Sequence, residues 1–161
     1  MRKFRQWLMI SSVLAVFATT SVFAEEESVW KFDDEHRILK DYTGEDREVI
    51  VPDTLMGCSV DGVESNAFYN SEITSLTFPE TVQYLNASTA AYCESLSELK
   101  LPQSLVMIGD GCFVATALQK VTIPANVRVF GEHAFSFCQK LRSITFEGEC
   151  PVFGGECFVA C

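Results

Sequence analysis

Self-similarity at a period of 22 to 23 residues is the feature that most constrains how this chain can fold. Short apolar segments recur at Leu76, Leu99, Val121 and Ile144, with spacings of 23, 22 and 23 residues. A unit of this length cannot bury its apolar face alone, so neighbouring copies must stack to form a common core. The period therefore predicts a solenoid.

Each unit begins with alternating apolar residues closed by proline, as in the segment from Leu99 to Pro102. The alternation predicts a short strand with one face inward, and proline ends it because it has no N–H to donate. A second apolar segment ends at glycine, as at Gly131, where we expect a corner with positive φ. A slot for an aromatic residue follows, with a small residue three positions later. The aromatic slots hold Phe68, Ala90, Phe113, Phe135 and Phe158.

These motifs carry a family resemblance. The order strand, proline, Ala-Phe, x-x-Cys, x-x-Leu resembles the BspA-type leucine-rich repeats, most specifically in EHAFSFC at 132–138 and ESNAF at 64–68. The resemblance covers residues 49–161 and departs from the family pattern in an irregular second repeat. It implies a leucine-rich repeat solenoid of stacked short parallel β-strands with short helical or 3-10 turns. It also implies adhesion and protein binding, mostly outside the cell and mostly without catalysis.

The first 24 residues predict a secretory signal peptide. Three basic residues precede an apolar run at 7–17, and Val22-Phe23-Ala24 offers small residues where a signal peptidase cleaves. The run is shorter than the roughly 20 residues of a membrane span. We therefore expect export, cleavage near Ala24, a secreted or cell-surface location, and no membrane span in the mature chain.

We expect a covering hairpin at the N-terminal end of the repeats and an open last repeat at the C-terminal end. Residues 25–48 read as two short strands around a polar turn, which predicts an N-terminal β-hairpin cap with Trp30 and Phe32 packed on the first repeat. The leucine-rich repeats occupy 49–161, and the last one stops at Cys161 in an incomplete unit. We expect either a fragment of a longer repeat protein or self-association through this open end.

Charge excludes one class of partner. Removing the predicted leader leaves nine basic and 22 acidic residues, a net charge of −13. Such a domain repels phosphate backbones, so nucleic-acid binding is disfavoured. The acidity is also an ordinary way of keeping an exported protein soluble.

Seven cysteines follow the leader, and an odd number leaves at least one unpaired in a monomer. Buried free thiols fit the narrow core best. A disulfide is the alternative, between Cys150 and either Cys157 or Cys161. A metal site at Cys112, His133, Cys138 and Cys157 has no C-x-x-C pair to support it, and no cofactor motif is present. We expect no cofactor and no enzyme activity.

The candidate binding residues lie on the outward face of the predicted first strands. In a solenoid these strands form one continuous sheet, and polar side chains between apolar ones point to solvent. The predicted row comprises Ser75, Thr77, Glu98, Lys100, Lys120, Thr122, Ser143 and Thr145.

The sequence favours an exported protein-interaction or adhesion module that binds a host, matrix or other surface protein through this face. A structural spacer within a larger surface protein is the first alternative. A thiol-dependent enzyme is the second, and would require one unusually reactive cysteine.

Overall fold

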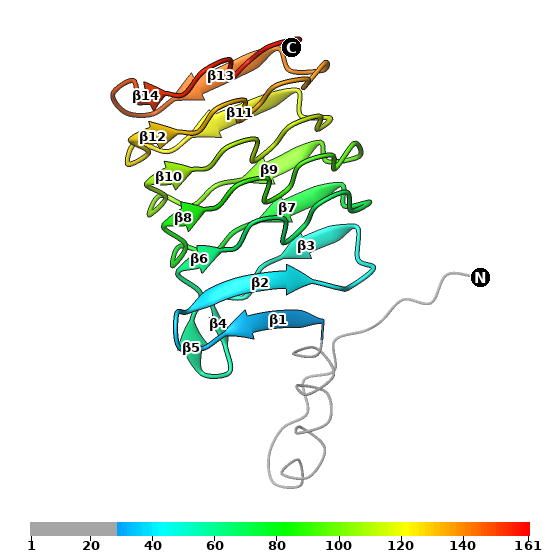
Figure 1. The fold of residues 1–161 in the computed structure, drawn as a ribbon, viewed down its shortest axis with the longest axis vertical. Coiled ribbons are helices and arrows are strands. Elements are labelled where there is room, and N and C mark those ends of the chain that lie inside the picture. The colour runs from blue at the N-terminus through cyan, green and yellow to red at the C-terminus, as the bar shows by residue number, and fades with distance from the viewer. Residues whose placement is uncertain (1–28) are drawn as a thin grey trace, which may run out of the picture.

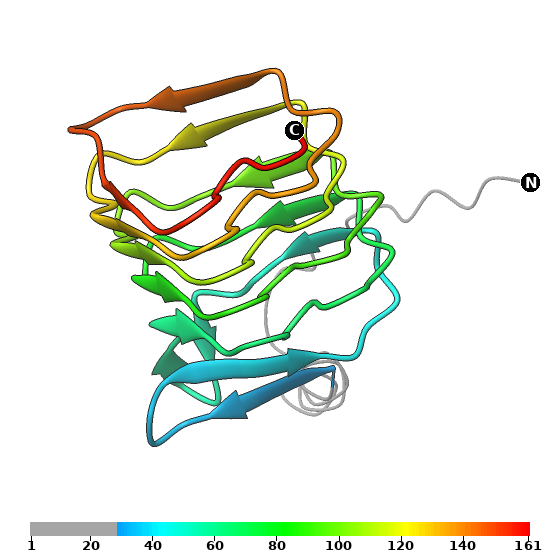
Figure 2. The same cartoon turned by 45° about the horizontal axis from the view of Figure 1, so that its top comes forward.

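The computed structural model describes residues 29–161, which coil into a stack of about five turns. Figure 1 shows the turns one above another in sequence order, and Figure 2 shows each turn running around a common interior. This is the predicted solenoid of stacked parallel strands. The predicted signal peptide at 1–24 lies outside the described residues.

Two strands form in most turns. The first strands are β3 (Glu48–Ile50), β7 (Ser75–Thr77), β9 (Glu98–Lys100), β11 (Lys120–Ile123) and β13 (Ser143–Phe146). The second strands are β6 (Gly62–Val63), β8 (Tyr84–Leu85), β10 (Met107–Ile108), β12 (Val129–Phe130) and β14 (Val152–Phe153). Where equivalent strands of neighbouring turns pair, they are parallel, so Leu76 lies beside Leu99 and Leu85 beside Ile108.

The N-terminal hairpin covers the first turn, as predicted. Its strands β1 (Trp30–Asp33) and β2 (Ile38–Tyr42) are antiparallel, and β2 pairs in parallel with β6. The Trp30 ring lies 4.5 Å from Tyr42 and 6.4 Å from Phe68, measured between centroids. Phe32 also packs against the core. The hairpin thus joins the sheet of second strands, whose order is β1-β2-β6-β8-β10-β12-β14.

The additional residues of the first unit form a second, smaller hairpin. Strands β4 (Thr54–Leu55) and β5 (Cys58–Ser59) pair antiparallel around Met56 and Gly57. Both turn residues have positive φ, 52° and 80°, as a tight two-residue hairpin turn of this hand requires.

The third side of each turn carries the Ala-Phe segment. No helix occurs between residues 29 and 161, so the predicted short helical or 3-10 pieces are hydrogen-bonded turns instead. Each holds two residues at positive φ, such as His133 and Phe137, which a right-handed helix cannot contain. Backbone bonds between turns hold them, including Phe113 N to Ala134 O at 2.8 Å.

The glycines that end the second strands correct a prediction. Gly109, Gly131 and Gly154 do not have positive φ. A Cβ on Gly109 would lie 2.7 Å from the carbonyl carbon of Asn86 in the preceding turn, and one on Gly154 would lie 2.6 Å from Glu132 N. These positions need glycine because successive backbones approach closely there.

Candidate interaction face

The eight predicted binding residues all lie on the first strands or at their starts, on the side away from the core. Ser75 and Thr77 are half-buried, and the other six are exposed. Register places Thr77 beside Lys100, and Thr122 beside Thr145. We call this set the strand face.

The strand face is carried by two sheets where one was expected. Strands β3, β7 and β9 form one sheet, while β11 and β13 form another. No backbone hydrogen bond joins β9 to β11, although β10 and β12, which follow them in the same two turns, are paired. Figure 1 shows a wider step between β9 and β11 than between β7 and β9. The sheet is therefore interrupted at the middle of the face.

A groove of about 660 Å³ occupies this interruption. Its lining includes four strand-face residues, Glu98, Lys100, Lys120 and Thr122. Leu99 also lines it and is half-buried, whereas its counterpart Leu76 on β7 is fully buried. The groove thus has an apolar strip between charged edges, a combination suited to recognition of a partner.

The proline end of the groove is crossed by side chains. Gln103 Nε2 donates to Glu147 Oε2 at 2.7 Å, linking turns that are 44 residues apart in sequence. Asn126 Nδ2 donates to Gln103 O at 2.7 Å from the intervening turn. The first of these bonds engages the Glu147 carboxylate. Within the described part of the chain neither Lys100 nor Lys120 makes a salt bridge.

Sequence reasoning missed two residues of β3 that extend the strand face. Glu48 pairs in register with Ser75 and Ile50 with Thr77; both are exposed, and Ile50 is 74% exposed. Ile50 lines a smaller groove of about 330 Å³ together with Trp30 and Tyr42 of the hairpin. The alternation of Val49, Ile50 and Val51 could have revealed Ile50, because the middle residue of such a run points outward.

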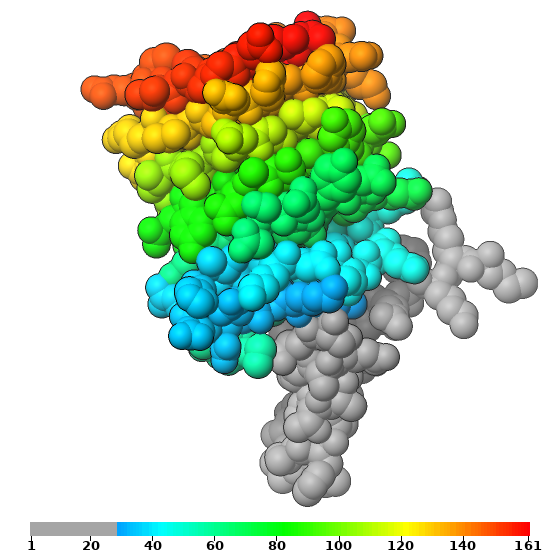
Figure 3. All heavy atoms as spheres, viewed as in Figure 1, coloured from blue at the N-terminus to red at the C-terminus, as the bar shows by residue number. Residues whose placement is uncertain are grey.

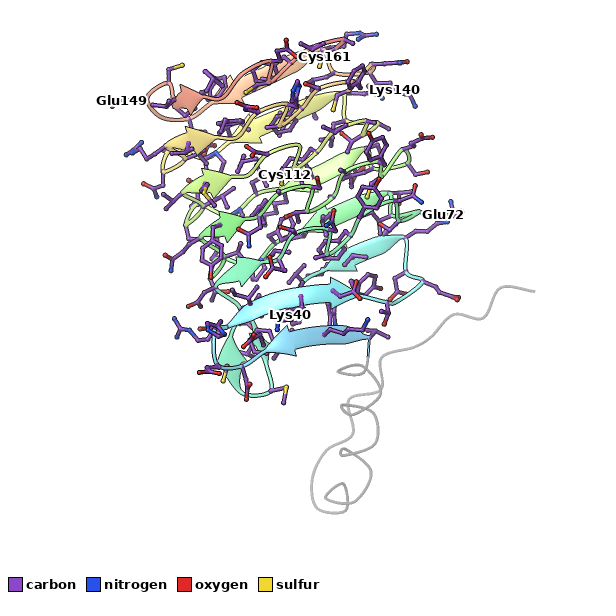
Figure 4. The ribbon with its side chains drawn as sticks, viewed as in Figure 1. Lys40, Glu72, Cys112, Lys140, Glu149 and Cys161 are labelled. Atoms are coloured by element: carbon purple, nitrogen blue, oxygen red, sulfur yellow. The ribbon has the colours of Figure 1, made fainter. Side chains whose placement is uncertain are left out.

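The cysteines lie mainly inside the stack. The buried ones are Cys93, Cys112, Cys138 and Cys157, while Cys58 is half-buried and Cys150 and Cys161 are exposed. Figure 4 shows Cys112 in the interior and Cys161 on the last turn. A disulfide between Cys150 and either Cys157 or Cys161 stays a prediction.

Buried thiols replace alanine or hydroxyl residues in two vertical rows. Cys93 Sγ donates to Phe68 O at 2.9 Å, and Cys138 Sγ donates to Phe113 O at 3.1 Å. Burial raises the pKa of both thiols, and it raises the pKa of Cys112 to about 12. A thiol nucleophile requires the opposite shift, so these three cysteines are unsuited to that chemistry.

His133 does not activate any of these thiols. Its Nδ1 lies 3.4 Å from Ser136 Oγ and 3.7 Å from Glu156 Oε2, on the exposed turn side. Between residues 29 and 161 no group of three or more His, Cys, Asp or Glu side chains could hold a metal ion. The same residues contain no helix long and apolar enough to cross a membrane.

Comparison with known proteins identifies the family of this chain. Residues 61–161 match the BspA type leucine rich repeat region, in six copies. The chain belongs to this family. None of the curated proteins compared with it matches.

Solved structures confirm the fold. A leucine-rich repeat protein of T. pallidum has a TM-score of 0.61 at 22% identity, covering 72% of this chain and 60% of that one. The pneumococcal vaccine antigen PcpA has a TM-score of 0.65 at 23% identity, covering 80% of this chain and 32% of its own length. A leucine-rich repeat protein of Bacteroides capillosus has a TM-score of 0.63 at 23% identity, covering 74% and 93%. This chain thus spans under two thirds of the first two proteins.

Proposed function

We propose that this protein is an exported interaction module that binds another protein through the strand face, without catalysis. The observation that carries the proposal is the groove at the interruption between β9 and β11, where four of the eight face residues meet beside a half-buried leucine. Family membership supports it, because solenoid repeats present extended surfaces for partners.

Three further features support this assignment over its alternatives. The buried thiols have raised pKa values, which disfavours a thiol-dependent enzyme. A spacer needs no free lysines beside a groove on a strongly acidic molecule. The leader at 1–24 supports a secreted or cell-surface location, as does the structural similarity to a pneumococcal vaccine antigen.

The test is capture of cell-surface and matrix proteins by residues 25–161, compared with a variant carrying Thr77→Arg and Thr145→Arg. These two positions lie on the strand face on either side of the groove and outside its lining. We expect arginine side chains at these positions to weaken the affinity for a captured partner about tenfold or more. A tenfold change corresponds to about 1.4 kcal/mol of binding free energy. Lys140→Glu, on the turn side, is the control. Equal capture by all three proteins would contradict the proposal.

A further inference from the structure

The two strands that border the groove present unpaired backbone edges to each other. In β9, Glu98 N donates to Thr74 O, and Lys100 O accepts from Phe78 N, so these two residues face β7. Successive residues of a parallel strand direct their backbone groups to opposite sides. Leu99 and Leu101 therefore direct N–H and C=O groups toward β11.

Strand β11 has a matching arrangement on the other side of the groove. Ile123 O accepts from Glu147 N, and Gln119 O accepts from Arg142 N, so alternate residues of β11 face β13. The residues between them, Lys120 and Thr122, direct their backbone groups toward β9. With no bond across the groove, both edges remain free. Elsewhere in the stack, first strands that are neighbours are paired.

We propose that this groove is the docking site for an extended segment of a partner protein, whose backbone bonds to these free edges and whose carboxylates pair with Lys100 and Lys120. This inference rests on the proposed function and adds a location and a partner chemistry to it. Addition of a strand to an exposed sheet edge is a general mode of peptide recognition, in which main-chain bonds supply affinity and side-chain pockets supply specificity.

The surroundings of the groove define the segment. Strand β11 has four residues, so at about 3.3 Å per residue the segment spans about four residues within the groove. Side chains of an extended segment alternate, so one set lies toward Leu99 and the other reaches the rim. An apolar residue alternating with Asp or Glu meets both the apolar strip and the lysines. Neither lysine has an intramolecular partner among the described residues.

The experiment uses residues 25–161 labelled with ¹⁵N and the blocked peptide acetyl-Thr-Val-Glu-Val-Glu-Val-Thr-amide. Amide shifts and exchange rates are followed by NMR during titration to about 5 mM, which detects weak binding. In the free protein, we expect the amides of Leu99, Leu101, Lys120 and Thr122 to exchange rapidly. Peptide should shift these four amides and slow their exchange.

Four changes separate the contributions. N-methylation of alternate peptide residues removes backbone donors without altering charge and should abolish the protection. The double variant Lys100→Glu and Lys120→Glu should weaken peptide binding about tenfold or more, because it replaces the attraction to the peptide carboxylates by repulsion. A tenfold change corresponds to about 1.4 kcal/mol. Lys140→Glu with Arg142→Glu makes the same charge change away from the groove and should leave it unaltered. Replacing each Glu of the peptide by Lys should also weaken binding.

The outcomes distinguish this inference from the proposed function. Shifts confined to Ser143, Thr145 or other parts of the strand face would overturn the groove assignment while supporting an interaction face. No shift at any amide, or binding that survives N-methylation, would also overturn it. If the protein self-associates and the Lys100→Glu, Lys120→Glu variant does not, the occupant of the groove is a second copy of the chain, and the proposed partner is overturned. If capture is lost in the Thr77→Arg, Thr145→Arg variant and retained in the Lys100→Glu, Lys120→Glu variant, the proposed function is supported and the groove assignment is overturned.

Discussion

At the scale of single residues, the core is organised by aromatic side chains in equivalent positions. Phe135 is fully buried, with ring centroids 5.2 Å from Phe113, 5.9 Å from Phe130 and 6.0 Å from Phe158. Ala90 interrupts this row, and Phe78, which directly follows β7, packs edge-on to Phe68 at 6.2 Å near the interruption. Phe135 thus contacts aromatic rings in the turns on both sides of it as well as in its own turn.

Truncation of this side chain, Phe135→Ala, should lower the free energy of unfolding by about 3 to 5 kcal/mol, because buried aromatic area is lost and a cavity remains. Urea denaturation followed by circular dichroism measures the change. Thr122→Ala, an exposed substitution, should shift the midpoint little. A small effect of Phe135→Ala would contradict the inward assignment of the aromatic slot.

The buried thiol of Cys112 links stability to high pH. Burial raises its pKa from 9.0 to about 12 in the folded protein. The unfolded chain loses the thiol proton at lower pH than the folded chain does, so ionisation favours unfolding. The stabilisation is complete below pH 9 and is lost as the pH rises toward 12.

We therefore expect the free energy of unfolding to fall above pH 9, and Cys112 to contribute up to about 1.4 kcal/mol per pH unit to that fall. Cys112→Ala should reduce the slope, because it removes the titrating thiol. The fold should tolerate the change, since alanine occupies the equivalent positions Ala67 and Ala134. Denaturation at several pH values between 8 and 11 provides the measurement. Parallel slopes in the two proteins would show that this thiol is not protected from ionisation.

At the scale of elements, close contact between turns sets the shape of each corner. The glycines after the second strands touch the backbone of the preceding turn, while the non-glycine residues His133 and Phe137 have positive φ, 55° and 60°. Such residues cost energy on their own. Backbone bonds between turns hold them, as where Phe137 N donates to Val159 O at 2.7 Å.

A methyl group at one of these corners should therefore disturb stacking. Gly109→Ala would place Cβ 2.7 Å from Asn86 C and 2.9 Å from Ala87 N, both backbone atoms that cannot move aside alone. We expect a loss of about 1 to 3 kcal/mol, typical of overpacking. Gly155→Ala is the matched control, because its nearest neighbour is the Glu132 carboxylate at 4.0 Å. Thermal unfolding of both variants compares them.

At the scale of the whole molecule, stability is distributed along one axis. Figure 3 shows the turns as successive bands in which each borders only its neighbours. The first turn is covered by the β1–β2 hairpin, whereas in the last turn Val152 is 73% exposed and Ile144 is only half-buried. In such a stack, stability comes largely from interfaces between neighbours.

Hydrogen exchange should reveal this gradient. Amides in β13 and β14 should open with a lower free energy than the paired amides of β7, β8 and β10, because fewer apolar contacts hold them. Mass spectrometry of fragments from residues 143–160 and 75–110 makes the comparison. Uniform protection across both fragments would contradict a gradient and indicate a single cooperative unit.

The repeat period and the alternation of apolar residues by themselves determined the solenoid, its short strands and the aromatic slots, and two short extended runs around a polar turn determined the hairpin over the first turn. These features depend on local patterns, because a side chain in a short strand points inward or outward according to its place in the alternation. Even Ala90 in the irregular repeat is fully buried in the aromatic slot. The eight residues of the strand face were identifiable for the same reason.

Only the tertiary structure decided where the strand face is interrupted and why the corner glycines are needed. Val121 and Leu99 carry equivalent patterns, so nothing local distinguishes the unpaired β9–β11 edge from the paired β7–β9 edge. Pairing depends on the spacing of whole turns, and close approach at Gly109 depends on the backbone of another turn. Both are properties of stacking between residues more than 20 apart, and a pattern within one repeat does not contain them.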